Sequence, residues 1–254
     1  MAAKRNPAGA IGVLGGMGPM ATVDFLAKVI ELTPASRDQD HLPLIVYSVP
    51  QVPDRSASIV EGRESPLPAM IEGLRTLVRA GVECIAIPCN TAHHWYDDLA
   101  RESSVPVLHM VDSAGAAMQR LGVPDGPVGL LATAGTLAAG IYPARLVRHG
   151  YECVVPDDGD METLVTPGIG LVKAGRVAEA EKLLRTAADN LLGRGARVVI
   201  LACTEIPVAL KDDDASEGRY VDATRALAEA CVRWSRGDDR PPPGAREKRQ
   251  RQNA

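Results

Sequence analysis

Two cysteines, Cys89 and Cys203, stand where their thiols could act as an acid and a base. Each follows an apolar stretch that predicts a β-strand, and each precedes polar residues typical of a helix start. A thiol there meets unsatisfied backbone N–H groups and the positive end of a helix, so we expect its pKa to be lowered. Such a pair suits the inversion of a stereocentre, because one thiolate removes an α-proton while its partner thiol protonates the opposite face.

The two cysteines lie at matching places in two similar halves of the chain. Residues 81–89 and residues 195–203 each contain a glycine, an apolar-rich stretch and a final cysteine. Residues 12–18 and residues 129–135 also match, at nearly the same offset along the chain. Two matches in the same order indicate related halves. If the halves pack face to face, the two thiols meet across one cleft.

Strand and helix patterns alternate, which predicts a parallel α/β architecture with ligands at the carboxyl ends of the strands. The predicted strands cover residues 10–14, 44–49, 83–88, 105–110, 128–132, 151–155 and 197–202. The predicted helices cover residues 21–32, 66–80, 177–192 and 221–234. We therefore expect two similar Rossmann-like α/β domains with parallel sheets, related by a pseudo-two-fold axis, with the active site in the cleft between them.

The domain boundaries follow from the same patterns. We expect a flexible N-terminal arm over residues 1–9, an N-terminal domain over residues 10–112 and a C-terminal domain over residues 113–212. Residues 213–234 are predicted to form a loop and a closing helix that packs back on the N-terminal domain. The acidic residues 211–217 predict an exposed loop, and the proline-rich, charged residues 235–254 predict a disordered tail.

Composition argues against several classes of partner. The net charge is -4 with the two signs interspersed, and aromatic residues make up only 3% of the chain, which disfavours a nucleic-acid partner. The five cysteines form no CxxC pair, so a zinc knuckle or a redox pair is not indicated. The N-terminal residues carry no apolar signal core, and no apolar run reaches the ~20 residues that span a bilayer. We expect a cytoplasmic protein with reduced thiols and no membrane partner.

Several segments together resemble the aspartate/glutamate racemase superfamily, and most of all its aspartate racemases. They are residues 11–19, 37–41, 50–55, 88–93, 130–136, 173–175 and 202–205. The resemblance covers about residues 10–230, in the order of the family. It implies two α/β domains, a site in the cleft between them, no pyridoxal phosphate or other cofactor, and commonly a homodimer.

By this resemblance, Cys89 and Cys203 are the acid/base pair. Arg55 and Lys173 match positions whose cations contact substrate carboxylates, which suits a dicarboxylic amino acid such as aspartate. Less specific matches to substrate-pocket positions are Met17, Gln51, Asn90, Thr91, Thr133 and Thr204. Ile169 stands where some aspartate racemases have a tyrosine. The function implied is a cofactor-independent isomerase that interconverts L- and D-aspartate.

Other functions stay open from the sequence. The same scaffold could serve glutamate racemisation, maleate isomerisation or malonate decarboxylation, and a non-catalytic protein that binds amino acids is a further alternative. A hydrolase would need one nucleophilic cysteine and a base such as His93 within reach. Residues 15–18 lack the full GxGxxG spacing of a dinucleotide site.

Neighbouring residues allow two interpretations each. His93 and His94 point to different helix faces, which is poor geometry for a metal, and His93 is either exposed or placed to tune Cys89. Glu205 either orients Cys203 or favours the helix start. The remaining cysteines are predicted to be small core residues; they are Cys84, Cys153 and Cys231.

Overall fold

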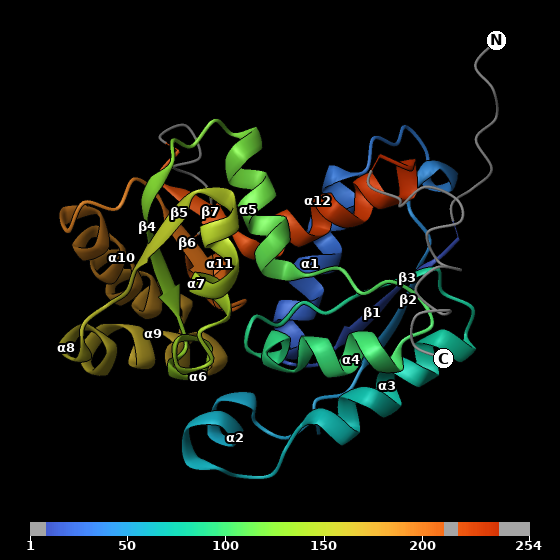
Figure 1. Cartoon of the computed structure of the whole chain (residues 1–254), viewed down its shortest axis with the longest axis horizontal. Helices are drawn as coiled ribbons and strands as arrows, with labels where there is room; N and C mark the ends of the chain where they lie inside the picture. The colour runs from blue at the N-terminus through green and yellow to red at the C-terminus, as the bar shows by residue number, and fades with distance from the viewer. Residues whose placement is uncertain (1–8, 211–217, 239–254) are drawn as a thin grey trace.

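The computed structural model describes residues 9–210 and 218–238, and these residues contain two parallel β-sheets (Figure 1). The first sheet, in the order β2-β1-β3, consists of β1 (Ile11–Gly15), β2 (Leu44–Ser48) and β3 (Cys84–Ala86). The second, in the order β5-β4-β6-β7, consists of β4 (Gly126–Ala132), β5 (Tyr151–Val154), β6 (Val199–Ala202) and β7 (Tyr220–Asp222). Every strand pairing is parallel, which confirms the predicted α/β class. The loop expected at 211–217, most of the N-terminal arm and the tail from residue 239 lie outside the described residues.

The two sheets share a strand order. In each, the first strand of the half lies between the second and the third, as β1 lies between β2 and β3 and β4 between β5 and β6. Cys89 follows β3 and Cys203 follows β6, so the two cysteines come after equivalent strands. This shared strand order is what two related halves would produce. The pseudo-two-fold axis and the domain boundaries remain predictions.

Helices surround both sheets (Figure 1). In the first half they are α1 (Pro19–Leu32), α2 (Arg55–Glu61), α3 (Leu67–Arg79), α4 (Tyr96–Glu102) and α5 (Met110–Arg120). The second half adds α6 (Ala134–Ala138), α7 (Ile141–Leu146), α8 (Asp158–Asp160), α9 (Thr166–Lys173), α10 (Val177–Gly193), α11 (Ile206–Ala209) and α12 (Ala223–Arg236). Short turns of tighter or wider helix are η1 (Asp38–Asp40), η2 (Thr91–Trp95), η3 (Val147–His149) and η4 (Met161–Val165).

Both faces of each sheet are covered, because successive strand residues point to opposite sides. In β4, Leu130 packs in a central core that joins strands of both sheets with α1, α5 and α12, while Leu131 packs on the other face against α9 and α10. In the first half, Cys84 faces the same central core and Ile85 faces the layer of α3. The two halves therefore share one apolar core.

Helix α12 connects the second sheet to the first half. It begins directly after β7, where the Asp222 carboxylate accepts hydrogen bonds from the N–H groups of Thr224 and Arg225 at 2.7 and 3.1 Å. It then packs against α1 and α5. Arg225 on α12 pairs with Glu31 of α1 at 3.0 Å. The chain thus returns from the second sheet to its first helix.

Two predicted elements are wrong. Residues 105–110 form no strand, because Val107 makes only an isolated bridge to Ile85 and the neighbouring Pro106 has no N–H to donate. Helix α5 already begins at Met110. Residues 221–222 belong to β7 and not to the closing helix, so the second sheet gains a fourth strand beyond residue 210.

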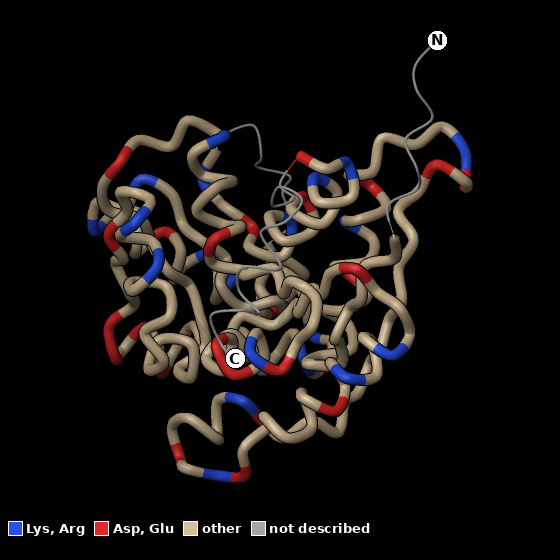
Figure 2. The backbone as a smooth tube through the Cα atoms, turned by 45° about the vertical axis from the view of Figure 1, so that its right-hand side comes forward, with Lys and Arg blue, Asp and Glu red and all other residues tan. Residues whose placement is uncertain are grey.

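The charged residues are interspersed along the described chain, as the sequence predicts (Figure 2). Blue and red segments alternate over both halves rather than gathering by sign. Among the described helices, none is both long enough and apolar enough to cross a membrane.

Candidate active site

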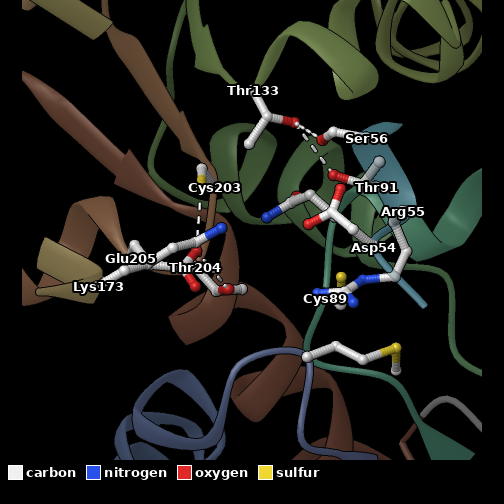
Figure 3. A pocket seen from close by; sticks show the side chains of 12 residues that line it. Asp54, Arg55, Ser56, Cys89, Thr91, Thr133, Lys173, Cys203, Thr204 and Glu205 are labelled. Atoms are coloured by element: carbon white, nitrogen blue, oxygen red, sulfur yellow. Dashed lines mark hydrogen bonds between the residues drawn. The ribbon is translucent and has the colours of Figure 1, made fainter. Parts of the chain in front are cut away.

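One pocket is lined by residues from both halves (Figure 3). The first half contributes Met17, Asp54, Arg55, Ser56, Cys89, Asn90 and Thr91, and the second contributes Thr133, Lys173, Cys203, Thr204 and Glu205. Met17, Cys89, Thr133 and Cys203 follow β1, β3, β4 and β6, so the pocket lies at the carboxyl ends of the strands, where parallel sheets bind ligands. Within the described part of the chain, the pocket is lined by each residue predicted for the site except Gln51.

Gln51 is exposed in the turn before α2, whereas its neighbour Val52 is buried. The turn directs Val52 inward and Gln51 outward, so the structure does not bring Gln51 to the pocket, and its role in substrate binding stays a prediction. Ile169 is buried in α9 and packs in the outer core of the second half. Asp54 and Ser56 line the pocket although the sequence did not single them out, and their only signal was adjacency to Arg55.

The two cysteines reach the pocket from opposite sides (Figure 3). Cys89 is 5% exposed and Cys203 is 4% exposed, and both thiols are free. Cys84 and Cys231 are fully buried in the central core, as predicted for small core residues. Cys153 is only partly buried, at the edge of that core. Cys89 and Cys203 therefore line the pocket, whereas the other three cysteines lie in or against the central core.

Burial, and not the helix start, decides how the two thiols ionise. It raises the pKa of Cys89, although the nearby Arg55 and a hydrogen bond from the backbone of Ala92 act in the opposite direction. Burial and then the Glu205 carboxylate raise the pKa of Cys203 well above its ordinary value. The elements after the cysteines, η2 and α11, have only five and four residues, so their dipoles are weak. The prediction of lowered thiol pKa values is wrong for the substrate-free protein.

Arg55 has a hydrogen-bond donor to spare. It is the first residue of α2, where the Asp54 carboxylate accepts from the N–H of Ala57 at 2.8 Å. One guanidinium nitrogen, Nη1, donates to the carbonyls of Val52 and Pro53 at 3.1 and 3.0 Å. Its Nε is buried and has no partner within the described chain. A carboxylate of a ligand would satisfy this donor.

Asn90 offers a second unused donor. Its Oδ1 accepts a 2.5 Å hydrogen bond from the hydroxyl of Tyr142, which lies on α7 of the other half. Burial raises the pKa of Tyr142 well above its ordinary value, so this hydroxyl keeps its proton. With Oδ1 engaged, the amide Nδ2 of Asn90 is buried and unpaired among the described residues. A buried donor without a partner is costly, and a bound anion would remove that cost.

Four hydroxyl groups join the halves beside these donors. The Thr91 hydroxyl lies 3.1 Å from that of Thr133 and 2.8 Å from that of Thr136. Ser56 donates to the Thr133 hydroxyl at 3.3 Å. Thr133 also caps α6 by accepting from the N–H of Thr136 at 3.1 Å. The cluster fixes this wall of the pocket, with Ser56 and Thr91 from one half and Thr133 and Thr136 from the other.

On the opposite wall, Glu205 holds the thiol of Cys203. The Sγ of Cys203 donates to Oε2 of Glu205 at 3.0 Å, and the Thr204 hydroxyl lies 3.4 Å from the same oxygen (Figure 3). This contact supports the interpretation that Glu205 orients Cys203. Lys173, in the last turn of α9, adds a cation to the same wall.

His93 is structural rather than basic. It is buried, its Nδ1 donates to the carbonyl of Cys89 at 2.9 Å, and its Nε2 accepts from the N–H of Met110 at 3.1 Å. Burial lowers its pKa, so it stays neutral. Both ring nitrogens are occupied by the backbone, which leaves none to activate the Cys89 thiol as a hydrolase would require. The interpretation of His93 as an exposed residue is wrong.

A close contact between the halves sets the position of Arg55. A Cβ atom on Gly135 would lie 2.6 Å from the Cα of Ser56, so α2 can pack on α6 only when this residue is glycine. We expect Gly135→Ala to push α2 outward and displace Arg55, raising KM for the substrate about tenfold or more. Gly193→Ala is the matched control, because a Cβ there meets nothing within 4 Å. Steady-state kinetics and thermal melting check this, and an unchanged KM in a folded Gly135→Ala protein would contradict it.

Fold and site together define a class: a protein of two parallel α/β sheets whose shared pocket pairs two thiols with unused donors for an anion. The chain belongs to the Asp/Glu/Hydantoin racemase family, whose model matches residues 14–231. It is 31% identical over 228 residues to the broad specificity amino-acid racemase RacX of Bacillus subtilis, which covers 87% of this chain and 96% of the relative. The family makes the chain a cofactor-independent, racemase-type isomerase.

Solved structures agree with this assignment. The Picrophilus torridus aspartate racemase superposes with a TM-score of 0.78 and 31% identity, covering 89% of this chain and 94% of that one. A glutamate racemase from Campylobacter jejuni shares the fold, with a TM-score of 0.59 and 19% identity over 89% of this chain and 85% of that one. The two-sheet α/β architecture is therefore that of the racemase structures.

Proposed function

We propose that the protein interconverts L- and D-aspartate by moving the α-proton between the substrate and the thiols of Cys89 and Cys203. One observation carries the proposal: the two thiols line one pocket from different halves, beside buried donors of Arg55 and Asn90 that have no partner among the described residues. The donors suit a carboxylate, and the thiols suit the two faces of the carbon next to it.

The proposed reaction moves one proton in and one proton out. A thiolate takes the α-proton, and negative charge spreads from Cα into the neighbouring carboxylate. Arg55 and Asn90 hold that carboxylate, so their donors stabilise the charge as it develops. The second thiol then gives its proton to the opposite face of Cα. At the end the pair still holds one proton, now on the other sulfur.

Two cations favour aspartate over amino acids with neutral side chains. Arg55 and Lys173 line the same pocket, and the substrate would present one carboxylate to each. Asp54 and Glu205 line it as well and offer acceptors for the ammonium group. The similarity to an aspartate racemase structure supports the same choice.

A second candidate is a racemase with a wider substrate range. Its support is the relative named for broad specificity. A panel of L-amino acids decides between the two. A kcat/KM for aspartate well above that for neutral amino acids favours the first candidate, and similar values favour the second.

The central experiment incubates the purified protein with L-aspartate in D2O without added cofactor. We expect D-aspartate to form, detected by chiral chromatography, with deuterium at Cα, detected by mass spectrometry. The absence of both exchange and inversion with aspartate, glutamate and neutral amino acids would contradict the proposed function. Light scattering on the same sample tests our further proposal that the protein is a homodimer.

The pH dependence of the reaction follows from the two thiols. Activity needs Cys89 without its proton and Cys203 with its proton, or the reverse. Burial raises the pKa of both thiols, and Arg55 opposes this at Cys89 whereas the Glu205 carboxylate adds to it at Cys203. We therefore expect kcat/KM to rise through the pKa of Cys89, above the ordinary thiol value of about 8.5. It should fall only at still higher pH, where Cys203 ionises. Rates measured across the alkaline range check this, and full activity at neutral pH would contradict it.

A further inference from the structure

We propose that Glu205 is a positioning residue that holds a proton on Cys203, so that Cys89 is the first of the two thiols to ionise in the substrate-free protein and serves as the base. This inference rests on the proposed function for its catalytic meaning. It goes beyond that function because it assigns unequal roles to two cysteines that occupy equivalent places in the two halves.

The environment of Cys203 favours a protonated thiol. Its Sγ lies 3.0 Å from Oε2 of Glu205, with the thiol as donor and the carboxylate as acceptor. If Cys203 were ionised, this hydrogen bond would be lost and two negative groups would face each other. A hydrogen bond from the backbone of Glu205 and the charge of Lys173 oppose this effect, although each influences Cys203 less than the Glu205 carboxylate does.

The charged and hydrogen-bonding groups nearest Cys89 favour its thiolate, although burial opposes them. The guanidinium group of Arg55 lies against this sulfur, and a hydrogen bond from the backbone of Ala92 reaches it (Figure 3). The charge of Arg55 acts on Cys89 more strongly than the Glu205 carboxylate does. The charged group that acts most strongly on the thiol is therefore a cation at Cys89 and an anion at Cys203.

Glu205 itself is held at the boundary of the halves. Its Oε1 faces Gly18, where an added Cβ would lie 3.4 Å from it. Gly18 is the N-cap of α1, a helix of 14 residues, so the carboxylate lies near a positive helix end. The remaining charged neighbours of the pair are Asp54 and Lys173, and neutral His93 contacts only the backbone of Cys89. The causes of the two pKa shifts agree with this, because the Glu205 carboxylate acts to raise the pKa of Cys203 whereas Arg55 acts to lower that of Cys89.

The unequal pair has a consequence for the cycle. When Cys89 has taken a proton from one enantiomer and Cys203 has given its own, the proton of the pair lies on Cys89. Cys203 is then a thiolate beside the Glu205 carboxylate. This form returns to rest either by converting the opposite enantiomer or by losing the Cys89 proton to water while Cys203 takes one from water. Glu205 makes the second route favourable.

Alkylation of the substrate-free protein tests the assignment without any racemase activity. Iodoacetamide reacts with thiolates, and peptide mass spectrometry follows Cys89 and Cys203 separately as the pH is raised. We expect the midpoint of Cys89 to lie at least about one pH unit below that of Cys203. In Glu205→Gln the midpoint of Cys203 should fall by about one unit, closing the gap. Comparing midpoints, and not rates, removes the difference in access between two buried thiols.

Controls keep the result specific. Glu162→Gln changes an exposed glutamate outside the pocket and should leave both midpoints unchanged. Arg55→Gln tests the other side of the pair and should raise the midpoint of Cys89, so the assignment is testable even where Glu205→Gln fails to fold. Equal midpoints in the unmodified protein, or a Cys203 midpoint unmoved in folded Glu205→Gln, would overturn the inference. A protein that shows the expected midpoints but racemises no amino acid would instead contradict the proposed function.

Discussion

Replacing either Cys89 or Cys203 by serine is expected to lower the rate of aspartate racemisation by about 10²–10⁴-fold. The serine hydroxyl has a far higher pKa than a thiol, so it neither accepts the α-proton nor returns one at a useful rate. Both directions should be affected, because each cysteine acts as base in one direction and as acid in the other. Chiral chromatography of product formed from each pure enantiomer measures the loss.

Deuterium exchange makes this test sharper. A variant that keeps only one thiol can still remove and return a proton on one face of Cα. Cys203→Ser should therefore exchange the α-proton of one enantiomer without inverting it, and Cys89→Ser should do the same for the other enantiomer. Cys153→Ser is the matched control, because Cys153 lies outside the pocket. Near-normal racemisation by either pocket variant would exclude the two-thiol mechanism.

The second large effect is expected for Arg55→Ala. Hydrogen bonds to charged groups contribute about 1.5–3 kcal/mol, so losing them should reduce kcat/KM for aspartate by roughly 10- to 150-fold. Loss of the cation beside Cys89 should also move the acid limb of the pH profile further to the alkaline side, since Arg55 acts to lower the pKa of that thiol.

The comparison of two further variants separates charge from geometry. Arg55→Lys keeps the positive charge but not the planar fork that grips a carboxylate, so it should recover part of the activity. Arg63→Ala is the control, because Arg63 is an exposed residue just beyond α2 that pairs with Glu61 at 2.7 Å and lies outside the pocket lining. Equal activities of Arg55→Ala and the native protein would show that the substrate carboxylate is held elsewhere.

The places of the two cysteines could be predicted because they depend on strong local signals. Runs of buried aliphatic residues mark β3 and β6, and a parallel sheet brings the carboxyl ends of its strands to one edge. Val107 and Val221 were assigned wrongly because local composition does not determine pairing. Pro106 leaves Val107 with a single bridge, and Val221 becomes a strand residue only because β6 lies beside it.

The chemistry around the thiols could not be predicted in the same way, because it depends on burial and on distant partners. The helix-start argument for Cys89 considers neighbours in the sequence, whereas the cost of removing its charge from water depends on the whole fold. Tyr142 reaches Asn90 from another element, and Ser56 reaches Thr133 only because Gly135 lets α2 approach α6. These contacts join residues that are far apart in the sequence, so no local sequence pattern predicts them.

The course of α12 has a consequence for how the molecule unfolds. Leu227, Cys231 and Trp234 on this helix fill the core that the two sheets share. Neither sheet with its own helices would be a complete folding unit, since each would leave a broad apolar surface in water. Denaturant should therefore melt the molecule in one cooperative transition, and fragments divided between the two sheets should stay insoluble unless they are expressed together.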